Sequence, residues 1–87
     1  MTDFHEYYVV LKSVGPDRVA VVSALRKILE QVGVAECGEL VARAQRGPIR
    51  VKEGIGRDDA EIVQQILEAA GATAEIVQIQ IPGLDYI

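Results

Sequence analysis

The sequence predicts an α+β domain, a two-layer sandwich in which three helices cover one face of a three-stranded sheet. Glycine and proline residues divide the 87 residues into six segments at regular intervals. Three segments alternate apolar and polar residues as strands do, and three repeat apolar residues at helical spacing. The resulting order is β-α-α-β-α-β, and with so few strands it leaves the second face of the sheet open.

The first strand and two helices are predicted in the N-terminal half. Residues 7–13 alternate between two faces, which is typical of a strand. Pro16 suits the first position of a helix, so a helix is expected from residue 16 to about 31. A second helix is expected over residues 34–45, after Gly33. Helical spacing predicts that the first helix buries Val21, Leu25, Ile28, Leu29 and Val32, and the second Val34, Cys37, Leu40, Val41 and Ala44.

The C-terminal half predicts a strand, a helix and a strand. The short strand covers residues 48–53, with Ile49 and Val51 facing inward. The helix covers residues 57–70 and buries Ala60, Val63, Leu67 and Ala70, before Gly71 acts as a left-handed cap. Residues 74–81 alternate as the last strand. We therefore expect one domain over residues 1–87, with a core at residues 6–81 and a C-terminal tail at residues 82–87.

The residues that most often carry catalysis or bind metals are scarce. His5 is the only histidine and lies near the N-terminus, where a solvated side chain is the simpler interpretation. Cys37 falls on a predicted buried stripe and is expected to act as a small apolar residue rather than a nucleophile. No cluster has metal-ligand spacing. The sequence thus predicts no enzyme activity, no cofactor and no metal.

Composition narrows the class of partner. The formal net charge is −4 and the nine basic residues are scattered, which disfavours nucleic acid. No apolar run approaches the ~18 residues of a membrane span. The N-terminus lacks the pattern of a secretory signal, and a single cysteine cannot form an internal disulfide. A cytoplasmic chain with a protein partner is the prediction.

Two surfaces of the predicted fold are candidates for a partner. On the outer side of the first helix, Val19 and Val22 lie beside Arg26, a mixture typical of interface cores. An ordinary, slightly apolar helix surface explains the same residues equally well. The second surface is the open sheet face, where alternation places these apolar residues: Tyr8, Val10, Val77, Ile79 and Ile81.

An apolar open face needs a cover, either the tail or a second chain. A second chain is favoured because the tail is short. Lys12, Arg50 and Lys52 are expected among or near these apolar residues.

Three stretches resemble a known family: YYVVLKSVGPDRVAVVSALR, then VGVAECGELV, then VKEGIGRDDAEIVQQILEAAGATAEI. They are similar to the C-terminal domain of the bacterial ribosomal stalk protein, an acidic, multi-copy protein of the large subunit. The resemblance covers roughly residues 6–77. It implies the strand and helix order derived above. It also implies a non-enzymatic domain that binds translational GTPases through the outer surface of its first two helices.

The implied binding residues in this chain are Arg18, Val19, Val22, Arg26, Gly33, Val34 and Glu36. The chain departs from the family at Ser23, Ala35 and Gly38, where the family usually has lysines that would complement an acidic partner. A glycine within a helix costs about 1 kcal/mol relative to alanine, so Gly38 could reflect close packing by a partner.

The ends of the chain leave two hypotheses open. The full stalk protein carries an N-terminal dimerisation domain and a hinge before this domain, and we expect this chain to stand alone without them. One hypothesis is a stalk-like module that binds translational GTPases. The alternative is a re-purposed domain that dimerises, or binds an unrelated protein, through the open sheet face and has no ribosomal role.

Overall fold

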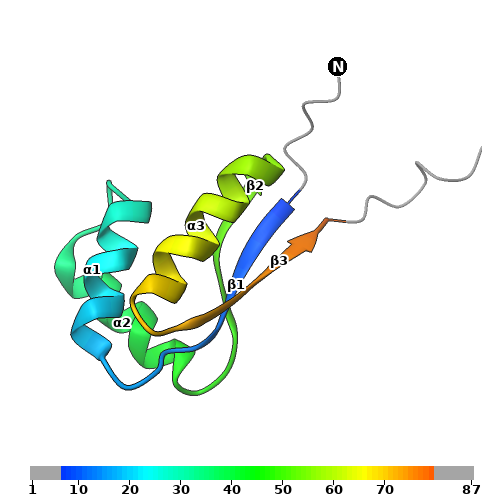
Figure 1. Cartoon of the computed structure of the whole chain (residues 1–87). Coiled ribbons are helices and arrows are strands. Elements are labelled where there is room, and N and C mark those ends of the chain that lie inside the picture. Colours follow the sequence, from blue (N-terminus) through cyan, green and yellow to red (C-terminus); the bar gives the residue numbers. More distant parts are fainter. Residues whose placement is uncertain (1–6, 80–87) are drawn as a thin grey trace, which may run out of the picture.

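The strands and helices follow the predicted order β-α-α-β-α-β in the computed structural model, which describes residues 7–79 (Figure 1). The strands are β1 (Tyr7–Ser13), β2 (Ile49–Ile55) and β3 (Thr73–Gln78). The helices are α1 (Arg18–Ile28), α2 (Val34–Ala44) and α3 (Arg57–Ala69). The predicted α+β class is therefore confirmed. The tail at residues 82–87, and the predicted strand residues 80 and 81, lie outside the described residues.

The sheet is antiparallel with strand order β2-β1-β3. On its inner face, Val9 lies opposite Ile76 and Leu11 lies opposite Ala74. Val9 and Leu11 are completely buried, whereas Tyr8 and Val10 between them are only half-buried. The helices therefore pack on the face that carries Val9 and Leu11, as predicted, and the opposite face is open.

The core fills the space between the inner sheet face and the helices. α3 packs along the sheet, while α1 and α2 pack against each other (Figure 1). The helices contribute these fully or nearly fully buried residues to the core: Val21, Ala24, Leu25, Ile28, Cys37, Val41, Ala44, Ala60, Val63 and Leu67. Leu29, Val32, Leu40 and Ala70, all predicted to be buried, are half-buried at the margin of this core.

Helix α1 is shorter at both ends than predicted. The side chain of Asp17 accepts a hydrogen bond from the Ala20 backbone N–H at 3.1 Å, which makes Asp17 the N-cap and leaves Pro16 outside the helix. At the other end Leu29 leaves helical geometry, although its backbone N–H still donates to the Leu25 carbonyl. Proline tolerates a first helical position, but the carboxylate cap sets the boundary here.

Val34 is exposed, so the prediction that it belongs to the buried stripe of the second helix is wrong. Cys37, Val41 and Ala44 are buried at the expected spacing, yet Val34 is 55% exposed. Helical side chains tilt toward the N-terminus, so a side chain in the first turn projects beyond the segment that packs on the core. The first residue of α2 therefore reaches solvent.

Strand β2 runs two residues further than predicted because it bulges. Gly54 adopts a φ of +69° and falls at a register shift between Tyr7 and Tyr8. This shift lets Ile55 pair with Tyr7. β3 begins one residue earlier than predicted, at Thr73, and ends at Gln78.

Two turns meet at one end of the domain. Gly15 connects β1 to α1 and Gly71 connects α3 to β3, with φ values of +82° and +92°. A Cβ atom added at Gly15 would lie 2.1 Å from the Gly71 carbonyl oxygen. Gly71 is the left-handed cap that the sequence predicted.

Candidate functional site

Helix α1 presents a row of exposed residues away from the core. Arg18, Val19 and Arg26 are exposed and Val22 is half-buried. Val19 is 76% exposed, the highest value among the large apolar residues that the structure describes. Residues three and four apart share one side of a helix, so Val19, Val22 and Arg26 form a continuous surface row. The structure thus places together the residues that sequence reasoning grouped.

The start of α2 carries the other residues of the predicted binding surface. Gly33 is the N-cap of α2, and its backbone N–H donates to the Glu36 carboxylate at 3.4 Å. This bond gives Gly33 and Glu36 a local structural role, because it satisfies one donor near the helix start. Val34 follows directly and is exposed. We call this set the helix face: Arg18, Val19, Val22, Arg26, Gly33, Val34 and Glu36.

Lys52 connects β2 to the end of α1. Its ammonium group donates to the Ile28 carbonyl oxygen at 3.4 Å, in a partly buried position. A cation at a helix C-terminus satisfies a free carbonyl and complements the helix dipole. Because α1 ends at Ile28, this contact anchors the segment that leads from α1 to Val34.

The expectation that Lys52 lies near the open sheet face is therefore wrong. A register shift between Val9 and Val10 places Lys52 opposite Val9, whose side chain faces the helices. Simple alternation along the sequence cannot reveal such a bulge. Gly54 does not signal this shift, because it lies at the other register shift, between Tyr7 and Tyr8.

The open sheet face carries Tyr8, Val10 and Val77, as predicted. Tyr8 lies directly opposite Val77 across the two strands, so their side chains share this face. All three are half-buried. Ile79 follows the end of β3, and Ile81 lies outside the described residues.

Charged residues interrupt this open face. The Arg50 guanidinium lies 4.1 Å from the centre of the Tyr8 ring, a cation–π contact. The Lys12 ammonium lies 3.3 Å from a Glu75 carboxylate oxygen. Lys12 and Arg50 therefore lie among the apolar residues of this face, as the sequence predicted.

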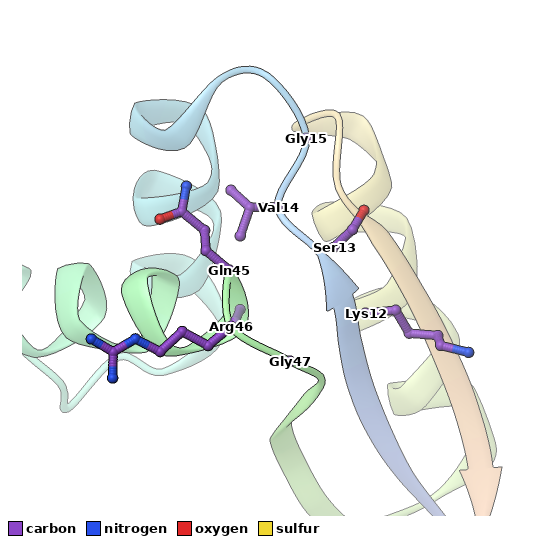
Figure 2. A pocket seen from close by; sticks show the side chains of 8 residues that line it. Lys12, Ser13, Val14, Gly15, Gln45, Arg46 and Gly47 are labelled. Carbon is purple, nitrogen blue, oxygen red and sulfur yellow. The ribbon is translucent and has the colours of Figure 1, made fainter.

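A surface hollow lies between the β1–α1 turn and the α2–β2 turn (Figure 2). Lys12 and Arg46 border it, but Figure 2 shows their side chains pointing away in opposite directions. Two cations that diverge do not form a binding site for one anion. This hollow is therefore not a candidate site.

Residues 7–77 match the family described as ribosomal protein L7/L12 C-terminal domain. The chain belongs to this family. Over 71 residues it is 41% identical to the large ribosomal subunit protein bL12 of Baumannia cicadellinicola subsp. Homalodisca coagulata and 42% identical to that of Kosmotoga olearia. The matched region is 82% of this chain and 55% of each relative, so the chain spans about half the length of the curated relatives it matches.

An L7/L12 C-terminal domain is a module of the ribosomal stalk, which confirms the resemblance found in the sequence. The L7/L12 family consists of structural, non-enzymatic ribosomal proteins, in agreement with the prediction that the chain is not an enzyme. Within residues 7–79, no group of His, Cys, Asp and Glu side chains could hold a metal ion. Over the same residues, no helix has the length and apolar character needed to cross a membrane.

The positions where this L7/L12 domain departs from the family pattern lie at or beside the helix face. Ser23 and Ala35 are exposed, and Gly38 is half-buried one turn after Val34. A Cβ atom at Gly38 would meet nothing within 4 Å, so the domain itself does not require glycine there. The glutamates at positions 30, 36 and 39 are exposed, the first just after α1 and the other two on α2. The helix face therefore combines three valines with arginines along α1 and a glutamate in the first turn of α2.

Proposed function

We propose that this domain binds translational GTPases through the helix face, as a stalk-like module of the bacterial cytoplasm. The observation that carries the proposal is the exposure of Val19 and Val34. The structure describes three large apolar residues as exposed, and two of them lie on α1 and α2. Aliphatic side chains that the domain leaves in water contribute to binding when a partner covers them.

Arg18 and Arg26 supply the polar part of the proposed contact. Both are exposed on the same helix as Val19. Arginine pairs with carboxylates in a fixed geometry and is enriched in interfaces. An acidic patch on the GTPase would therefore meet these two arginines while an apolar patch covers the valines.

Ser23, Ala35 and Gly38 stand where the family usually has lysines, and this difference should affect both the rate of association and its dependence on salt. Exposed charges mainly accelerate encounter and make it dependent on salt. With fewer of them, we expect slower association than a lysine-rich face would give, and a weaker dependence on salt. The aliphatic contacts then supply a larger share of the binding free energy.

The test is an NMR titration of the labelled chain with a bacterial elongation factor bound to GTP. We expect shifts centred on Val19, Val22, Arg26 and Val34. A V34D variant should weaken binding by about tenfold or more. Ile62 provides a matched control, because it is 53% exposed on α3 and lies outside the helix face. I62D should bind as the wild-type chain does.

Two results would contradict the proposal. One is the absence of shifts at the highest factor concentration. The other is an equal loss of affinity in V34D and I62D, which would indicate that a general change of charge, and not the helix face, is responsible.

The second candidate is that the sheet provides a separate protein interface, as a homodimer or with another protein partner. Tyr8 and Val77 form an apolar cross-strand pair on the uncovered face, with Val10 beside them. This candidate does not involve the helix face, so the two functions can coexist.

A further inference from the structure

Two neighbouring hollows lie at the C-terminal end of α1. The first is lined by four exposed residues, Ser23, Arg26, Lys27 and Glu30. The second is lined by residues 28–32, which lead out of α1, and by Lys52 of β2. Because Glu30 lines both, the two hollows flank one side chain, and we call them together the α1-end groove. Both are open to solvent, which suits a segment of a protein better than an enclosed small molecule.

The α1-end groove is continuous with the helix face. Arg26 belongs to both, because it lies one helical turn after Val22 on α1 and also lines the first hollow. A partner that covers Val22 and Arg26 therefore reaches the groove without crossing another element.

The groove is positively charged, although the chain has a formal net charge of −4. Its charged residues are Arg26, Lys27, Lys52 and Glu30. Glu30 follows Lys27 by three residues and Arg26 by four, a spacing at which helical side chains form ion pairs. Leu29 leaves helical geometry, with φ −111° and ψ 76°, so Glu30 is not held over the preceding turn. Within residues 7–79 it forms no ion pair with either cation.

Lys52 also keeps capacity to bind a partner. An ammonium group has three N–H donors, and the Ile28 carbonyl oxygen, at 3.4 Å, accepts from this one. Lys52 forms no ion pair with any residue that the structure describes. Leu29 and Val32, which line the same hollow, are half-buried against the core. The second hollow thus combines a cation with aliphatic surface.

We propose that the GTPase partner extends an acidic segment along the α1-end groove, with one carboxylate at Arg26 and Lys27 and another at Lys52. Charge complementarity selects this occupant, because three cations and one carboxylate line the groove. Glu30, between the hollows, opposes the segment and lowers its affinity. The proposal rests on the proposed function, since the groove continues the helix face.

Substitutions that change charge but hardly change size test the proposal. The affinity of the full chain for the elongation factor bound to GTP is measured by NMR titration. E30Q removes the opposing carboxylate and should tighten binding about threefold. Q31E places a carboxylate in the second hollow and should weaken binding about threefold. A gain of affinity in E30Q cannot result from misfolding.

Two matched controls lie on α3. E68Q and Q65E repeat the same two substitutions at exposed positions that line neither hollow. Both should bind as the wild-type chain does, because salt largely screens charges outside the contact. Equal changes of affinity in the controls and in the groove variants would assign the effect to net charge and overturn the proposal.

V34D distinguishes a failure of the groove from a failure of the proposed function. Loss of binding in V34D, together with wild-type affinity in E30Q and Q31E, would overturn the groove and leave the helix face in place. The expected changes in E30Q and Q31E, with wild-type affinity in V34D, would support the groove and contradict the helix face. A factor that does not bind the wild-type chain would overturn both.

Other occupants of the groove would give different results. Weaker binding in E30Q would indicate a basic segment in place of an acidic one. Signals of Gln31 and Lys52 that shift as the concentration of the chain alone rises would assign the groove to a second copy. Either result would overturn the proposal.

Discussion

Aliphatic side chains reach solvent in two regions of this domain, the helix face and the open sheet face, but their surroundings differ. On the sheet, Arg50 stacks on Tyr8, and the Lys12–Glu75 ion pair lies on the same face as Val10. On the helix face, Val19 is 76% exposed and Val34 is 55% exposed. The domain therefore shields its sheet surface partly with its own charged side chains and leaves the helix valines in water. An apolar residue that its own fold does not shield is the stronger candidate for contact with a partner.

The largest predicted effect is at Gly15, the turn that joins the two regions. G15A would force a left-handed backbone on alanine and place its Cβ atom 2.1 Å from the Gly71 carbonyl oxygen. Strain and backbone overlap together should lower the free energy of unfolding by about 3 kcal/mol or more. Urea denaturation measures this, and both surfaces should be lost together as the domain unfolds.

The control for Gly15 is Gly54, which has a φ of +69° but open space around its missing Cβ. G54A should cost only about 1 kcal/mol, because strain acts there without overlap. Equal losses in both variants would mean that the contact between the two turns contributes nothing to stability.

The next largest effect is expected at Lys52, and comparing it with Lys12 distinguishes the helix face from the open sheet face. K52M removes the donor to the Ile28 carbonyl and should cost about 1 kcal/mol, since that bond is partly buried. NMR amide shifts should spread through residues 28–34 and reach Val34. K12M removes an ion pair whose side chains are 49% and 56% exposed, so its effect on stability should be near zero. Shifts at Val34 in K12M, or their absence in K52M, would contradict an anchoring role for Lys52.

The fold was largely predictable because its signals are local. Apolar periodicity located all six elements, and Gly71 ended α3 as expected. The errors came from contacts between elements or from capping. The Asp17 carboxylate shifted the start of α1, and the bulges of β2 moved Lys52 to the helix side. Neither effect changes the apolar pattern on which the prediction relied.

The helix face was only partly predictable. Helical spacing predicted that Val19 and Val22 lie outside the core stripe of α1. The same reasoning placed Val34 in the core, because periodicity does not show where the first turn of a helix extends past its packing surface. The roles of these residues in binding came from the family resemblance and stay a prediction.

The smallest predicted effect is that of G38A, which should raise the stability of the domain but weaken its binding to a partner. Gly38 lies within α2, where a Cβ atom would meet nothing within 4 Å. G38A should therefore raise the free energy of unfolding by about 0.5–1 kcal/mol, because alanine favours a helix. If a partner packs closely on α2 beside Val34, the same methyl group should weaken binding to the elongation factor severalfold.

G47A is the matched control, since Gly47 also has open space but lies after α2. It should leave the affinity unchanged. Equal affinities of G38A and G47A would show that the glycine does not serve a partner, and would restrict the binding surface to α1 and the first turn of α2.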